Sequence, residues 1–130
     1  LGVEPVELVD EALAAFYDRL LRLANDPLLH TGEWRLLDVR ELDHIAEHVI
    51  AWRWKNDTGD LRIIVVNPGE HVAHGRVDIV EDLPDAEDVG FEDLLDGRTY
   101  SWSRADLIDR GLYVRLGAGQ AHVFAVSRDS

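Results

Sequence analysis

The sequence predicts a mainly β protein, an antiparallel Greek-key β-sandwich of about eight strands preceded by one N-terminal α-helix. Short segments rich in β-branched and aromatic residues recur after Pro27, and turn-forming residues separate them. No helical segment alternates with these strands, which argues against a parallel, doubly wound sheet. The chain has 130 residues, 46% of them hydrophobic, and no cysteine, so its core must form without disulfides.

The first predicted unit covers residues 1–26, and its helix runs from Glu4 to Ala24. Pro5 suits the first helical turn, where its missing N–H costs nothing, and Asn25 and Pro27 end the helix. Apolar side chains spread over roughly 180–220° of its circumference, whereas a helix on a single core needs a stripe of about 100°. We therefore expect a helix that is covered on two sides.

The second predicted unit, residues 27–130, is the sandwich. Its strands are separated by turn signals such as Asn67-Pro68-Gly69 and Asp96-Gly97, where glycine accepts a positive φ. The acidic segment Glu81–Asp88 is expected to be a solvated loop. The expected strands are Glu33–Val39, His48–Asn56, Leu61–Asn67, Val72–Val80, Phe91–Leu95, Arg98–Trp102, Gly111–Leu116 and Ala121–Val126.

The net charge of the chain excludes some classes of binding partner. The chain has 13 Lys and Arg against 26 Asp and Glu, a formal net charge of −13. Such a charge repels phosphate backbones and anionic lipid headgroups, so we expect no nucleic-acid and no membrane partner. No apolar run is long enough to span a bilayer, and we expect a cytoplasmic protein. The chain opens at Leu1 and contains no methionine, so we expect it to be a piece of a longer protein.

One local pattern has the spacing of a metal site. His44-Ile45-Ala46-Glu47-His48 matches the H-x-x-E-H of inverted zinc peptidases, in which two histidines lie one helical turn apart. Here the segment is a short connection between two expected strands, and no partner helix is available for a third ligand. We expect solvated histidines, no metal and no cofactor.

No pair of carboxylates stands out as catalytic. Pairs such as Glu92/Asp93 and Asp106/Asp109 are expected by chance in so acidic a chain, whereas a glycosidase needs two carboxyl groups that face each other across a cleft. The chain also lacks G-x-S-x-G and the glycine-rich phosphate loops. We therefore predict no catalytic residue.

The tryptophans are the candidate binding residues. Trp52 and Trp54 are two apart on an expected strand and so share one face with Ile50, while Arg53 and Lys55 would lie solvated on the other face. Aromatic pairs can form a platform for sugar rings, but they more often pack in a core. Packing is the first interpretation, and Trp52, Trp54 and Trp102 are the candidate sugar-stacking residues.

Taken in order, several motifs carry a resemblance to a known family. They are Phe16-Tyr17-Asp18-Arg19-Leu20-Leu21, Pro27-Leu28-Leu29, Gly32-Glu33-Trp34, Ile63-Ile64-Val65-Val66-Asn67, Asp93-Leu94-Leu95-Asp96-Gly97-Arg98-Thr99-Tyr100, Gly111-Leu112-Tyr113-Val114-x-Leu116 and His122-Val123-Phe124. This succession resembles the carboxyl-terminal end of α-amylase-family enzymes, glycoside hydrolase family 13. The last turn departs from the family, which often has proline and an aromatic residue where this chain has Gly117-Ala118-Gly119-Gln120.

The resemblance implies that residues 1–26 are the last helix of a missing (β/α)8 barrel and that residues 27–130 are the domain packed against it. It implies a non-catalytic domain that stabilises the barrel of an enzyme acting on α-glucosidic bonds, since the family's catalytic carboxylates lie upstream. Without its barrel, the helix is expected to be buried by self-association. The alternative is a carbohydrate-binding module that stacks α-glucan on exposed tryptophans.

Overall fold

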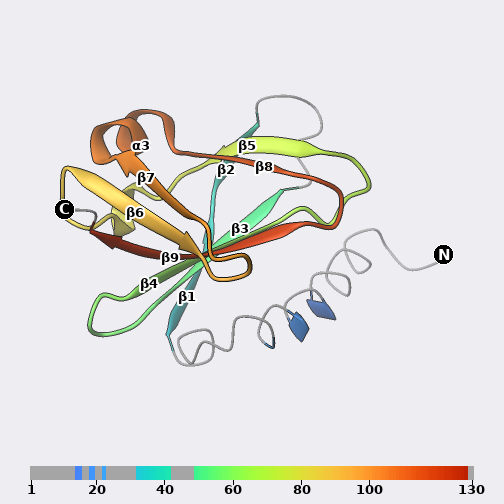
Figure 1. Ribbon diagram of the computed structural model, residues 1–130, viewed down its shortest axis with the longest axis horizontal. Helices are drawn as coiled ribbons and strands as arrows, with labels where there is room; N and C mark the ends of the chain where they lie inside the picture. Colours follow the sequence, from blue (N-terminus) through green and yellow to red (C-terminus); the bar gives the residue numbers. More distant parts are fainter. Residues whose placement is uncertain (1–13, 16–17, 20–21, 23–31, 42–48, 129–130) are drawn as a thin grey trace.

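The computed structural model describes residues 14–15, 18–19, 22, 32–41 and 49–128. In these ranges the elements are β1 (Glu33–Leu37), β2 (Val39–Glu41), β3 (Ile50–Lys55), β4 (Leu61–Val66), β5 (Ala73–Val77), η2 (Val80–Asp82), β6 (Asp88–Asp93), β7 (Thr99–Ser103), α3 (Arg104–Arg110), β8 (Leu112–Leu116) and β9 (Ala121–Arg128). The strands form two antiparallel sheets, of order β1-β3-β4-β9-β6-β7 and β2-β5-β8 (Figure 1). A mainly β, antiparallel protein with about eight strands is therefore confirmed.

Other parts of the fold prediction are not tested. The helix expected from Glu4 to Ala24 lies almost wholly outside the described residues, as does the boundary at residue 26. The helix, the two-unit division and the Greek-key connectivity therefore stay predictions. In the part of the chain that the structure describes, no helix is long and apolar enough to cross a bilayer.

One apolar cluster lies between the two sheets. Along β5 and β8 every second residue is buried, as expected of antiparallel strands with one face on a core. The buried residues of both sheets join in this cluster. It includes Ala51, Ile63, Val65, Val89, Phe91, Phe124 and Val126 of the six-stranded sheet and Ala73, Val77, Leu112, Val114 and Leu116 of the three-stranded sheet.

The six-stranded sheet is also apolar on its outer face. Trp52, Ile64, Val66 and Val123 form a second buried cluster there, with Ile50 and Trp54 packed partly buried against it. This explains why β4 is an almost continuous apolar run instead of an alternating one. The expectation that Trp52 packs on one face with Ile50 and Trp54 is confirmed.

The strand expected at Glu33–Val39 is in fact two strands. The chain leaves the six-stranded sheet at Asp38, and its next residues pair with β5 in the three-stranded sheet. The carbonyl of Asp38 accepts a hydrogen bond of 2.9 Å from the amide of Asp78. No glycine or proline marks this crossover, so turn residues did not reveal it.

A short helix, α3, was not predicted. The Ser103 side chain caps its start by accepting a hydrogen bond from the Asp106 amide, and Leu107 packs into the core. Gly111 ends the helix at φ +79°, and a Cβ there would lie 2.8 Å from the Val77 carbonyl oxygen. Ser103 three residues before Asp106, with Gly111 at the end, is the sequence signal that could have revealed it.

Two connections between the sheets meet at one buried side chain, that of Asn67. One connection follows β4 and leads to β5, and the other joins β8 to β9. The Asn67 Nδ2 donates to the carbonyls of His71 at 2.7 Å and of Leu116 and Gly117 at 3.1 Å, and the Asn67 Oδ1 accepts from the Gly69 amide at 3.0 Å. The Asn67 backbone also exchanges hydrogen bonds with Gln120 and Gly119 at 2.9 and 3.0 Å. Asn67 therefore ties the two crossovers together.

Candidate functional site

The tryptophans lie in different environments. Trp52 is buried and Trp54 is partly buried in the outer cluster. Trp102, on edge strand β7, is 37% exposed, and Trp34, on edge strand β1, is 52% exposed. The structure does not bring the three candidate sugar-stacking residues together, since Trp102 pairs with the core residue Val89 and so shares its inward face. Their role as sugar-stacking residues stays a prediction.

A cavity of about 190 Å³ lies beside Trp102. It is formed by the inner face of β6, β7 and β9 together with β8, the edge strand of the three-stranded sheet. The cavity is mostly aromatic: it is lined by Phe91, Tyr100, Trp102, Tyr113, His122 and Phe124, with Arg115 among its other lining residues. A concave site with aromatic walls and a few polar groups is the usual form of a small-molecule site.

The ring of Phe124 contacts three other rings that line this cavity. Phe91 and Tyr100 meet it edge-on, with ring centroids 5.7 and 6.0 Å away and interplanar angles of 78° and 88°. His122 stacks on it at 4.9 Å and 23°. Such edge-to-face and stacked pairs each contribute about 0.5–1.5 kcal/mol beyond their burial, so they hold the rings in fixed positions.

His122 is held by a buried carboxylate, that of Asp93. The His122 Nδ1 lies 2.7 Å from Asp93 Oδ2, while Asp93 Oδ1 accepts hydrogen bonds from the amides of Leu95 at 3.0 Å and Val123 at 3.4 Å. Burial, the largest single influence, raises the pKa of Asp93. The hydrogen bonds from His122 and the two amides, with the charge of His122, outweigh it and leave the pKa of Asp93 below its ordinary value. The pair orients the imidazole and leaves Nε2 without a partner among the described residues.

We expect Asp93 to make the fold sensitive to acid. Because its pKa is lower in the folded than in the unfolded chain, its contribution to stability is present above the ordinary aspartate pKa of about 3.9 and is lost as the pH falls through the folded value. Urea unfolding of Asp93→Asn from neutral to acid pH should show a flatter fall in the free energy of unfolding than the native protein. Glu92→Gln, which removes the exposed carboxylate next in sequence, is the control. Equal slopes for Asp93→Asn and the native protein would contradict this role.

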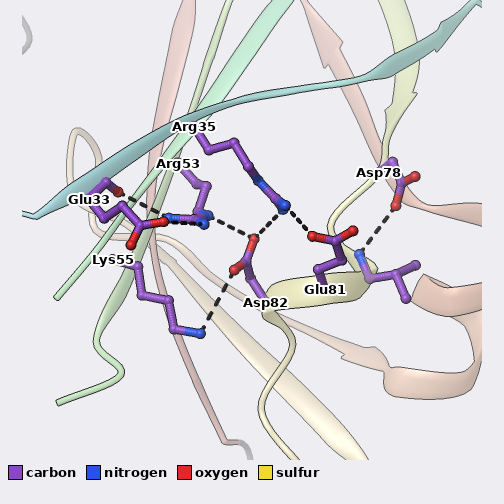
Figure 2. A network of polar contacts seen from close by, with 8 residues as sticks. Glu33, Arg35, Arg53, Lys55, Asp78, Glu81 and Asp82 are labelled. Atoms are coloured by element: carbon purple, nitrogen blue, oxygen red, sulfur yellow. Dashed lines mark hydrogen bonds and ion pairs between the residues drawn. The ribbon is translucent and has the colours of Figure 1, made fainter. Parts of the chain in front are cut away.

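A second polar cluster lies at the β1 edge of the sandwich, around Asp82 (Figure 2). Asp82 Oδ2 accepts hydrogen bonds from Arg35 Nη2 at 2.8 Å and from Arg53 Nε at 2.9 Å, and Lys55 Nζ lies 3.8 Å from its Oδ1. Arg53 also donates to the Glu33 carbonyl at 3.0 Å. The Asp82 and Arg53 side chains are only 6% and 7% exposed.

Arg35 connects this cluster to the surface. It also pairs with Glu81. The hydrogen bond to Glu81 is the largest influence on the pKa of Arg35 and raises it, whereas burial lowers it. The negative charges of Asp82 and Glu81 also raise this pKa, which lies above its ordinary value. Within the described cluster three cations, Arg35, Arg53 and Lys55, meet three carboxylates, Glu33, Glu81 and Asp82. The charges balance internally, which favours a structural role over ligand binding.

This cluster corrects two predictions. Arg53 is not solvated: its register partner is Arg35, it follows Ala51 on the inner face, and η2 supplies its partner Asp82. The acidic segment Glu81–Asp88 is not simply a solvated loop, because Asp82 is buried in ion pairs and Asp88 begins β6. In both cases a distant partner of opposite charge offsets the cost of taking a charged group out of water.

The zinc motif at His44 and His48 lies outside the described residues. Within the ranges that the structure describes, no three side chains of His, Asp or Glu come together as a metal site.

No family model and no curated protein matches this chain. Among solved structures, a protein of Bacillus halodurans C-125 described as a "putative alpha-N-acetylgalactosaminidase" is similar in fold, with a TM-score of 0.51 and 14% sequence identity. The similarity covers 74% of this chain but only 21% of that one, so the match spans about a fifth of the larger protein. At this identity the likeness shows the fold alone.

Proposed function

We propose that this chain is the non-catalytic C-terminal β-sandwich domain of an α-amylase-like glycoside hydrolase or glucanotransferase. Its role is to stabilise a catalytic barrel that precedes it, in an enzyme acting on α-glucosidic bonds. The motifs from Ile63 to Phe124 that resemble the glycoside hydrolase family support this proposal. A structural neighbour described as a glycosidase, of which the chain spans only a fifth, also supports it.

The outer face of the six-stranded sheet is the observation that carries the proposal. Trp34 and Leu36 of β1 pair with Trp54 and Trp52 of β3, so all four lie on that face. Trp52 is buried there, but Trp34 and Leu36 are 52% and 58% exposed. An apolar face that continues from buried to exposed side chains is typical of a surface that docks onto another body. We assign that body to the barrel.

The test uses the longer coding sequence and a double variant, Trp34→Ala with Leu36→Ala. We expect the longer protein to act on α-glucans and the double variant to lower its melting temperature. In the 130-residue chain the same variant should change stability by no more than about 0.5 kcal/mol, as for a surface site. Ile108→Ala, which removes a 40% exposed apolar side chain from α3, is the matched control.

Three results would contradict the proposal. The first is a longer protein without activity on α-glucans, and the second is a double variant that leaves the melting temperature of the longer protein unchanged. The third is fluorescence quenching that finds Trp34 equally accessible in the longer protein and in the 130-residue chain. The expected self-association of the 130-residue chain through residues 1–26 is measured separately, by light scattering.

A further inference from the structure

We propose that the outer face of the three-stranded sheet docks an acidic segment of a protein partner, whose carboxylates pair with Arg40, Arg76 and Arg115. This face lies on the opposite side of the sandwich from the surface around Trp34, because the apolar cluster lies between the two sheets. Docking there is independent of the barrel-stabilising role proposed above and adds a second partner to it.

The register of the strands brings the three arginines onto one face. Alternate residues of β5 and β8 are buried against the core, so the residues between them point outward. Arg40 of β2 is the register partner of Arg76 and so shares that face. The outward positions of the paired residues, here called the basic face, are Arg40, His74, Arg76, Tyr113 and Arg115. None of these positions is acidic.

A face without carboxylates is unexpected in this chain. Acidic residues outnumber basic ones by 26 to 13, and Arg35 and Arg53 are both ion-paired. Among the described residues, Arg40, Arg76 and Arg115 have no ion-pair partner. Like charges at directly opposite positions of two strands destabilise a sheet, so the Arg40–Arg76 pair carries a cost. A carboxylate supplied by a partner removes this cost.

The side chains of Arg40 and Arg76 both extend toward β8. The guanidinium carbon of Arg76 lies 5.4 Å from the centroid of the Tyr113 ring. Arg40 reaches across β5: its Nη2 lies 3.2 Å from the position that a Cβ of Gly111 would take, just before β8. A guanidinium over a ring keeps the N–H groups at its edge free, and these can bond a carboxylate in pairs. Arg76 is therefore held in place for a carboxylate, and the exposed Arg40 and Arg115 lie on the strands that flank it.

The extent of the basic face favours a short acidic segment as its occupant. A single small anion would have to draw three long side chains together, at a cost in side-chain entropy. An extended peptide carries the side chains of alternate residues about 7 Å apart on one face, so its carboxylates can meet separate arginines. A nucleic acid or an anionic membrane carries charge continuously and would extend beyond the basic face onto a chain of formal net charge −13.

The test is fluorescence anisotropy of a labelled hexaglutamate peptide titrated with the 130-residue chain at low salt. We expect saturable binding that weakens as sodium chloride is added. Arg76→Gln should weaken binding by about fivefold, the upper range for one exposed ion pair, and adding Arg40→Gln and Arg115→Gln should weaken it by about tenfold or more. Arg98→Gln removes the same charge as Arg76→Gln from the exposed connection between β6 and β7, and it should leave the affinity unchanged.

Thermal unfolding of each variant separates binding from folding. Arg40→Gln removes one of two opposed like charges, so it should weaken binding while its melting temperature stays the same or rises. A loss of binding that accompanies a lower melting temperature would contradict this role for Arg40.

Three results would overturn the proposal. They are no binding of hexaglutamate, an equal loss of affinity in Arg98→Gln and Arg76→Gln, and displacement of the labelled peptide by a short DNA duplex or by inorganic phosphate as readily as by unlabelled hexaglutamate. Each of them leaves the docking role of the surface around Trp34 untouched.

Discussion

Replacing Asp82 with alanine is expected to lower the free energy of unfolding by about 3–5 kcal/mol, the range found when one partner of a buried ion pair is removed. Asp82 lies between Arg35 and Arg53, with hydrogen bonds of 2.8 and 2.9 Å. Without it, two guanidinium groups remain side by side on adjacent strands, and that of Arg53 is almost fully buried. Urea unfolding at neutral pH measures the loss.

The control is Asp85→Ala, in the same segment but exposed, for which a change within about 0.5 kcal/mol is expected. Removing Asp85 lowers the net negative charge by the same amount, so the pair of variants separates local pairing from overall charge. A loss below about 1 kcal/mol in Asp82→Ala would show that water or rearranged side chains replace the carboxylate.

The second large effect is expected at Asn67. Its side chain donates hydrogen bonds to three carbonyls and accepts one from an amide in the two crossovers between the sheets, and the residue is fully buried. Asn67→Ala leaves these groups without their partner, and one unsatisfied buried group costs about 1–3 kcal/mol. Because neighbouring losses are not additive, we expect about 3 kcal/mol in total by urea unfolding.

Asn56→Ala gives the comparison. Asn56 Oδ1 also accepts hydrogen bonds from a turn, from the amides of Thr58 and Asp60, but that turn is exposed and water can replace the side chain. A loss of about 1 kcal/mol is expected there. If the two variants were equally stable, burial of Asn67 would not be the reason for its effect.

Local signals in the sequence predicted the fold class well. The turn at Asp96-Gly97 contains a positive φ of +78° at Gly97, and the alternation in β5 and β8 matches their buried faces. The crossover at Asp38 was not predicted, because a strand can pass from one sheet to another without any turn residue. Helix α3 was missed because its seven residues carry only one buried side chain.

The polar sites depend on residues far apart in the chain. Arg53 and Asp82 are separated by 29 positions, as are Asp93 and His122. A single sequence shows the charge of each residue but not which distant residue meets it. Trp102 was a candidate only as one of three tryptophans on expected strands, because the sequence does not show which of these rings is exposed. The cavity beside it depends on how the two sheets pack.

The position of β9 has a consequence for biosynthesis. It follows every other described strand in the chain, yet it lies between β4 and β6 in the middle of the six-stranded sheet (Figure 1). Until the ribosome has released this segment, the β1-β3-β4 half and the β6-β7 hairpin have no common partner. Their unpaired edges would then be open to other nascent chains, so the interval before β9 is synthesised is the period in which aggregation is most expected.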